Sequence, residues 1–206
     1  NILKTIELNG ESTALIMLGG VNYYTGQKYD MEIIAEAGKK VGAFVGYDLA
    51  HAAGNVSLNM HDWNVDFAAW CNYKYLNCGP GAPSGIFVHE KHHKWEGARF
   101  AGWWSNKIDT RFKMDPNLDP IQNAAGWGIS NSPIFSMAPL KNGLEIYREV
   151  GMSRFVEVSH QLTGYLESII RSELPQMSII TPNNPSERGC QISMMVENGK
   201  SVYEAL

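Results

Sequence analysis

Two charged side chains lie just after two apolar runs in this 206-residue chain, where they could share one reaction centre. Lys74 follows the run 67–71, and Asp48 follows the run 43–47, with His51 shortly after it. Ligands of open α/β sheets bind outside the carboxyl ends of the strands, so the three side chains could meet in one crevice. An amine beside a carboxylate suggests an aldehyde cofactor, because the lysine could form a Schiff base while the aspartate keeps a pyridinium nitrogen protonated. Spacing alone also allows the simpler interpretation that these are solvated residues at strand ends.

The pattern of apolar residues predicts an α/β domain. Apolar residues recur at helical spacing over 30–42, after the capping residue Asp30 and up to Gly42, which predicts a helix between the first two strands. A strand, a helix and a strand in this order form a βαβ unit, so these strands should be parallel with a right-handed crossover. The expected strands cover residues 13–18, 43–47, 67–71 and 85–88.

The last third of the chain has a different pattern. A helical region is expected over residues 133–170, ended by Pro175. Two strands, at 178–181 and 191–196, should follow it. We therefore expect a domain boundary inside the helical region, near residue 138.

Composition indicates an ordinary globular protein, with 44% hydrophobic residues and a net charge of −4. Basic residues are spread singly, which gives no support for nucleic-acid binding. No run approaches the length of a membrane span and no signal peptide opens the chain, so we expect a soluble cytoplasmic protein. The three cysteines, an odd number without paired-motif spacing, fit a reducing compartment better than a disulfide framework.

Several stretches resemble one known family. They are residues 20–27, 46–55, 61–63, 65–71, 73–77, 102–103, 110–115 and 129–133. Through them the chain resembles the pyridoxal 5′-phosphate (PLP)-dependent enzymes of the aspartate aminotransferase fold, and among these the kynureninase family. The resemblance implies that residues 1–137 are the C-terminal half of the PLP-binding large domain, a mostly parallel sheet with helices on both faces. Residues 138–206 would be the connecting helix and part of a small α+β domain.

The resemblance also implies roles for individual residues. Lys74 matches the lysine that holds PLP and later moves the α-proton of the substrate. Asp48 matches the acid that pairs with the pyridine nitrogen, and His51 matches a histidine that contacts the cofactor beside it. Tyr73 matches a tyrosine near the phosphate that takes part in proton transfer.

Two further residues match positions that line cofactor and substrate. These are Trp103 and Asn131, and in homodimers of this family the neighbouring subunit can contribute them. The sequence departs from some relatives at Gly19, where a serine would offer a hydroxyl near the cofactor.

The activity implied by the resemblance is hydrolysis of L-kynurenine or 3-hydroxykynurenine to anthranilate or 3-hydroxyanthranilate and L-alanine, in tryptophan catabolism and NAD biosynthesis. The same fold serves cysteine desulfurases and aminotransferases, which form the main alternative, because fold alone does not determine the reaction. A zinc module built on His89, His92 and His93 is a weaker alternative with too few ligands. A third alternative is an inactive interaction fragment. Neither end resembles a natural terminus, so we expect the phosphate-binding loop and the carboxylate-binding arginine to be missing, and the isolated chain to be inactive.

Overall fold

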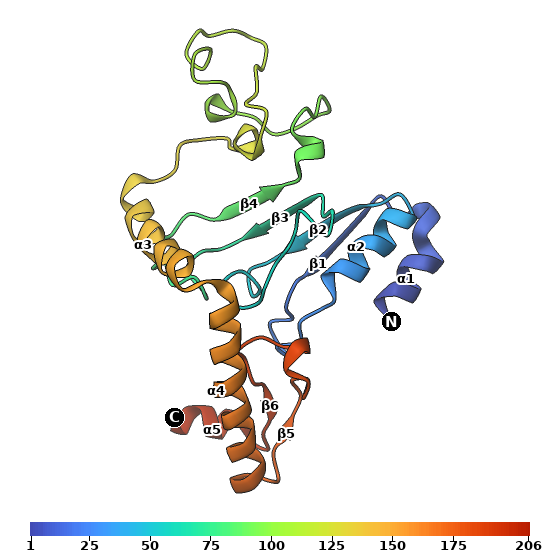
Figure 1. The fold of residues 1–206 in the computed structure, drawn as a ribbon, viewed down its shortest axis with the longest axis vertical. Helices are drawn as coiled ribbons and strands as arrows, with labels where there is room; N and C mark the ends of the chain where they lie inside the picture. Colours follow the sequence, from blue (N-terminus) through green and yellow to red (C-terminus); the bar gives the residue numbers. More distant parts are fainter.

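A four-stranded sheet lies at the centre of the computed structural model, which describes residues 1–206 (Figure 1). Its strands are β1 (Leu15–Gly19), β2 (Phe44–Asp48), β3 (Phe67–Trp70) and β4 (Gly85–Val88), in the order β1-β2-β3-β4. The first three strands are parallel, and β4 runs antiparallel to β3. The prediction of a mostly parallel α/β sheet is therefore confirmed.

Helix α2 (Met31–Lys40) is the crossover between β1 and β2, and helix α1 (Ile2–Asn9) packs beside it. The Asp30 side chain caps α2 by accepting a hydrogen bond from the Ile33 amide at 3.1 Å. The buried face of α2 packs on one face of the sheet, against residues such as Val45 and Tyr47. This arrangement is the predicted βαβ unit.

The last third of the chain leads away from the sheet along two helices (Figure 1). They are followed by a small hairpin and a short helix; the elements are α3 (Ile134–Val150), α4 (Met152–Glu173), β5 (Ser178–Ile179), β6 (Met194–Met195) and α5 (Gly199–Ala205). The expected helical region 133–170 is thus divided at Gly151, whose φ of 81° lies in the left-handed region that ends helices. The domain boundary near residue 138 would fall inside α3 and stays a prediction.

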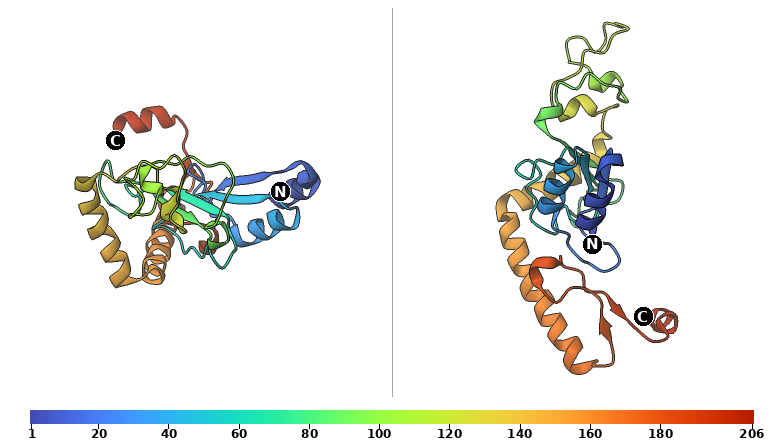
Figure 2. Two further views of the ribbon diagram at one scale, coloured as in Figure 1. Left: turned by 90° about the horizontal axis from the view of Figure 1, so that it is seen from above. Right: turned by 90° about the vertical axis from the view of Figure 1, so that its right-hand side faces the viewer.

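A loop-rich extension between β4 and α3 projects away from the sheet, on the side opposite to α4 (Figures 1 and 2). Three short 3-10 helices lie in this extension: η2 (Glu90–His92), η3 (Trp103–Ser105) and η4 (Ala124–Trp127). Two others, η1 (Gly10–Ser12) and η5 (Pro185–Glu187), lie elsewhere in the chain. No helix of the structure combines the length and the apolar character needed to cross a membrane.

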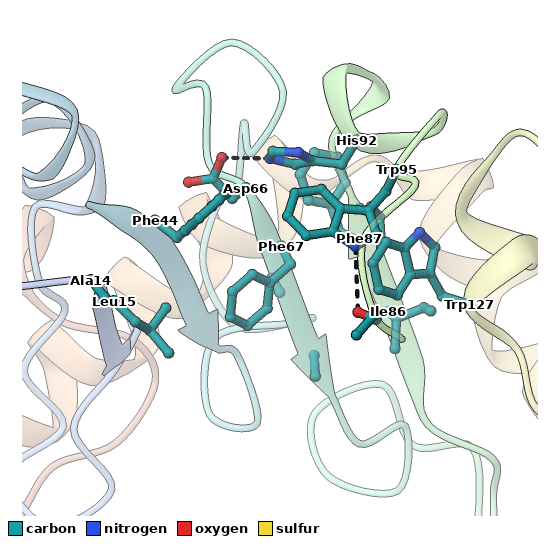
Figure 3. A pocket seen from close by; sticks show the side chains of 14 residues that line it. Ala14, Leu15, Phe44, Asp66, Phe67, Ile86, Phe87, His92, Trp95 and Trp127 are labelled. Carbon is teal, nitrogen blue, oxygen red and sulfur yellow. Dashed lines mark hydrogen bonds and ion pairs between the residues drawn. The ribbon is translucent and has the colours of Figure 1, made fainter. Parts of the chain in front are cut away.

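The sheet face opposite α2 is apolar and open. Leu15 is 49% exposed and Phe44 is 44% exposed, although both belong to strands of a largely parallel sheet. Together with Phe67 they line a hollow of about 570 Å³, which Trp95 and Trp127 border on the side of β4 (Figure 3). Parallel sheets are normally covered on both faces, so this open face is a departure from the usual arrangement.

A buried carboxylate ties the amino ends of the sheet together. Asp66 immediately precedes β3, and its side chain is only 4% exposed. It accepts hydrogen bonds from Lys39 Nζ at 2.8 Å, from the Val45 amide at 2.7 Å and from His92 Nε2 at 2.7 Å. Lys91 Nζ lies 2.8 Å from the same carboxylate. Burial raises the pKa of this carboxyl, but the surrounding donors outweigh burial and hold the pKa well below its usual value.

We expect Asp66→Asn to lower the free energy of unfolding by about 3 kcal/mol, the low end for removing one partner of a buried ion pair, because both lysines keep some contact with water. The oxygen of the asparagine side chain can still accept a hydrogen bond from the Val45 backbone amide, but the two lysines lose their anionic partner. The measurement is urea unfolding at neutral pH. Asp119→Asn, in the exposed pair with Lys107, is the matched control and should leave the midpoint nearly unchanged.

The same contribution should depend on pH. The folded pKa of Asp66 lies below its unfolded value, so its stabilisation is complete above about pH 4 and is lost as the pH falls toward the folded pKa. The difference in stability between wild type and Asp66→Asn should therefore narrow below about pH 4. A difference that stays constant down to pH 2.5 would contradict this assignment.

Candidate functional site

The parallel pairing of β2 and β3 brings the predicted site residues to one edge of the sheet. Gly46 pairs with Phe67 and Asp48 with Ala69, so the two strands reach their carboxyl ends together. The loop after β2 carries His51, and the loop after β3 carries Lys74. The convergence that the strand-end argument predicted is present in the structure.

Three side chains form a continuous hydrogen-bonded chain at this edge. Lys74 Nζ lies 3.1 Å from His51 Nε2, and His51 Nδ1 lies 3.3 Å from the Tyr75 hydroxyl. The rings of His51 and Tyr75 meet edge to face, with centroids 5.9 Å apart. All three residues are half-buried. The imidazole therefore bridges the lysine amine and a phenol.

Backbone contacts hold the two loops in place. Asn55 donates to the His51 carbonyl at 2.9 Å and accepts from the Cys190 amide at 2.9 Å, so it joins the loop after β2 to the C-terminal segment. The Tyr147 hydroxyl from α3 lies 2.6 Å from the Tyr75 carbonyl and 3.0 Å from the Gly54 carbonyl. Helix α3 therefore fastens both loops at one point.

Asp48 is exposed at the end of β2, and one of its oxygens accepts a hydrogen bond from the Ala50 amide at 2.9 Å. Burial and the nearby charge of Lys74 lower the pKa of His51, while the charge of Asp48 acts in the opposite direction. Neither Asp48 nor Lys74 belongs to any ion pair of the structure. An unpaired amine and an unpaired carboxylate are therefore available beside one imidazole.

A cavity of about 680 Å³ opens next to the lysine. Residues of both strand-end loops, of α3, of α4 and of the C-terminal segment line it, among them His51, Lys74, Tyr75, Tyr147, Phe155, Ser159, Leu162 and Cys190. Sequence reasoning had assigned a role only to the first two of these. Tyr75 could have been noticed as the neighbour of Lys74, whereas the contact of Tyr147 with Tyr75 spans 72 positions and has no local signal.

The structure places the other four predicted site residues, Asp48, Tyr73, Trp103 and Asn131, outside the lining of this cavity. Tyr73 is 54% exposed, and a hydrogen bond with Cys71 raises the pKa of its phenol. Trp103 lies in the extension and packs edge-on against Phe112, with ring centroids 5.6 Å apart. Asn131 is exposed near the end of the extension. A single copy of this chain thus does not bring Trp103 or Asn131 to Lys74.

The histidines of the zinc alternative have separate partners. The ring of His89 stacks on that of His61, with centroids 4.9 Å apart, while His92 binds the Asp66 carboxylate and His93 approaches the Val88 carbonyl. They do not converge on a common point, and no other group of three potential ligands is placed to hold a metal ion.

Comparison with known proteins agrees with the fold. The model of the aminotransferase class-V family matches residues 3–205. The kynureninases of Flavobacterium psychrophilum and Flavobacterium johnsoniae are 51% and 50% identical to the chain, over 100% of its length and 50% of theirs. The chain therefore spans about half the length of the curated relatives it matches.

Solved structures share the fold at low sequence identity. A mutant of C-DES, with glycine covalently linked to its PLP cofactor, superposes with a TM-score of 0.80 at 17% identity, over 99% of this chain and 54% of that one. A cysteine desulfurase from Thermococcus onnurineus superposes with a TM-score of 0.74 at 18% identity, over 98% of this chain and 50% of that one. The family match, which extends over nearly the whole chain, shows that this protein belongs to the aminotransferase class-V family.

Proposed function

We propose that this chain carries the cofactor-binding lysine and acid of a PLP-dependent kynureninase. The reaction would be hydrolysis of L-kynurenine or 3-hydroxykynurenine to anthranilate or 3-hydroxyanthranilate and L-alanine. The observation that carries the proposal is the 3.1 Å approach of Lys74 Nζ to His51 Nε2 at the edge where Asp48 ends its strand. The identity of about half of all residues to curated kynureninases supports this choice of reaction.

The donor set fits PLP. Lys74 offers an amine without a carboxylate partner, which suits condensation with an aldehyde, and Asp48 offers a carboxylate without a cation, which suits a pyridinium nitrogen. Bound PLP would supply the electron sink that stabilises negative charge at the α-carbon of the substrate. His51 would lie beside the cofactor, and Tyr73 would lie near its phosphate.

Lys74 would also transfer the proton that leaves the substrate α-carbon. An amine can accept this proton only when it is neutral. Burial and the charge of Lys74 keep the pKa of His51 below its ordinary value, so the imidazole stays neutral and can accept a hydrogen bond from the Lys74 amine. The negative charge of Asp48 would keep the pyridine nitrogen of the cofactor protonated throughout.

We propose a homodimer in which a second copy supplies Trp103 and Asn131, because neither residue lines the cavity at Lys74 within one copy. The side chains that line one site would then come from two chains. A domain boundary near residue 138 would place Lys74 in the large domain and α4 in the small one. Three free cysteines support the cytoplasm as the compartment.

A cysteine desulfurase is the second candidate, since a solved structure with that activity shares the fold. The two reactions differ in the bond that is broken, a carbon–carbon bond in kynurenine and a carbon–sulfur bond in cysteine. Their products are easily distinguished: kynurenine gives anthranilate, and cysteine gives a sulfane sulfur that an added thiol reductant releases as sulfide.

Reduction with borohydride in the presence of PLP should attach a pyridoxyl group to Lys74, because this amine is the one beside the proposed site. Peptide mapping by mass spectrometry gives the position. Label on Lys39, Lys40 or Lys91 in place of Lys74 would reject the assignment.

A chimera tests the reaction. Residues 1–206 would replace the matching half of the Flavobacterium psychrophilum kynureninase, and the parent enzyme would be the control. We expect release of anthranilate from kynurenine and no sulfide from cysteine, whereas the chain assayed alone should turn over neither substrate. Sulfide without anthranilate from a folded, PLP-loaded chimera would favour the desulfurase.

Asp48→Asn in this chimera should lower kynurenine turnover by roughly 100-fold or more, because the pyridinium proton and with it the electron sink are weakened. The fold should be almost unaffected, since substitution at an exposed site costs about 0.5 kcal/mol or less. Asp62→Asn, also exposed, is the matched control. Near-normal turnover by a PLP-loaded Asp48→Asn chimera would return Asp48 to the role of a solvated strand-end residue.

A further inference from the structure

We infer that Tyr75 is a positioning residue for this site: its hydroxyl fixes the ring of His51 so that Nε2 faces the amine of Lys74. The catalytic meaning of this role rests on the proposed function of Lys74. The orientation of the His51 ring by Tyr75 does not depend on that function, and it can be tested on the chain without cofactor.

The contacts of the imidazole leave Tyr75 as the residue that orients it. His51 has one side-chain partner on each ring nitrogen, Lys74 at 3.1 Å on Nε2 and Tyr75 at 3.3 Å on Nδ1. A ring held only at Nε2 could pivot about that contact. The second contact, on the other nitrogen, determines the plane of the ring and makes one orientation the favoured one.

The hydrogen-bonding capacities of the three groups determine where the protons lie. An ammonium is only a donor, so a protonated Lys74 requires His51 Nε2 to accept and places the imidazole proton on Nδ1. Nδ1–H then donates to the Tyr75 oxygen. A neutral Lys74 can accept from Nε2–H, and in that case the Tyr75 hydroxyl donates to Nδ1.

A phenol serves both arrangements because its O–H can rotate between donating and accepting. Tyr75 can therefore hold the ring in one place while Lys74 changes its protonation state. Burial, together with the nearby Cys190, raises the pKa of Tyr75, so the phenol stays protonated at neutral pH. Phenylalanine at this position would fill the same space but could neither donate a hydrogen bond to His51 nor accept one from it.

The fold anchors both partners of this contact through their backbones. The Tyr147 hydroxyl lies 2.6 Å from the Tyr75 carbonyl, and Asn55 donates to the His51 carbonyl at 2.9 Å. The main chains of the two residues are thus held independently of the side-chain contact. The remaining groups around the imidazole are the carboxylate of Asp48 and the ring of Tyr23, whose centroid is 6.3 Å away.

The experiment measures the tautomer of His51 by NMR in the 206-residue chain with ¹⁵N-labelled histidine rings, at a pH where the ring is neutral. His51→Gln identifies the signal. We expect two well-separated ring-nitrogen shifts in wild type, as for a fixed tautomer with the proton on Nδ1. In Tyr75→Phe the ring loses its contact at Nδ1 and can turn away from Lys74, so the two shifts should move toward the averaged values of a mobile ring. Unchanged His51 shifts in a folded Tyr75→Phe variant would overturn the inference.

Two control variants separate orientation from stability. Tyr147→Phe keeps the Tyr75 hydroxyl but removes the contacts with two carbonyls, so it should lower the unfolding midpoint and leave the His51 tautomer fixed. Tyr165→Phe, whose parent side chain is 69% exposed, should change neither. If Tyr147→Phe shifts the His51 nitrogens as much as Tyr75→Phe does, the role of Tyr75 is general support of the loop and the inference is wrong.

Two results keep the inference separate from the proposed function. If Tyr75→Phe does not fold, wild type decides, because averaged His51 nitrogens in the wild-type chain would overturn the inference and a fixed Nδ1–H form would support it. A fixed tautomer together with borohydride label away from Lys74 would reject the proposed function but keep the position of Tyr75. Labelled Lys74 with an unaffected His51 in Tyr75→Phe would reject this inference alone.

Discussion

The arrangement of the sheet depends on one buried carboxylate, that of Asp66. It accepts hydrogen bonds from the Lys39 amine of α2, the Val45 amide of β2 and the His92 ring of η2, so these three elements meet at one anion just before β3. Asp66 also hydrogen-bonds through its own amide to the Val45 carbonyl, at 2.9 Å. These contacts align the starts of β2 and β3. Because parallel strands that start in register also end in register, they determine where the loops carrying His51 and Lys74 emerge.

Charged side chains have ionic partners at one end of the sheet and lack them at the other. At the amino ends Asp66 is buried and fully surrounded by donors, which is the condition under which a buried charge stabilises a fold. At the carboxyl ends Asp48 and Lys74 have no ionic partner, and the half-buried imidazole of His51 lies between the Tyr75 phenol and the Lys74 amine. Unpaired charges of this kind contribute little to stability but remain free to bind an oppositely charged group. The side chain that stabilises the fold and the side chains proposed to carry out the chemistry thus lie at opposite edges of the same sheet.

Local patterns were sufficient to predict the strands, the α2 crossover and the meeting of His51 with Lys74, because all of these follow from apolar periodicity and parallel topology. The division of the long helical region was missed, although Gly151 provided a signal for it. The contacts of Tyr147 and Asn55 could not have been predicted, since they join segments 72 and 135 positions apart and depend on how the helices pack. That Trp103 and Asn131 lie outside the cavity at Lys74 could not have been predicted either, since both belong to the loop-rich extension, where no apolar periodicity indicates how the chain folds.

The open face of the sheet is connected to the site by the geometry of β2. Side chains of a strand alternate between faces, so Phe44, Gly46 and Asp48 share the face that lacks a covering layer. Gly46 leaves room there for the ring of Phe67, which a Cβ would contact. A polypeptide layer that covered this face as far as the end of β2 would also border the Asp48 carboxylate. Exclusion of water at that point would strengthen any interaction of Asp48 with a cationic ring nitrogen, because charges interact more strongly when the local dielectric is lower. Covering this face as far as the end of β2 would therefore bury the apolar side chains and also support the proposed role of Asp48.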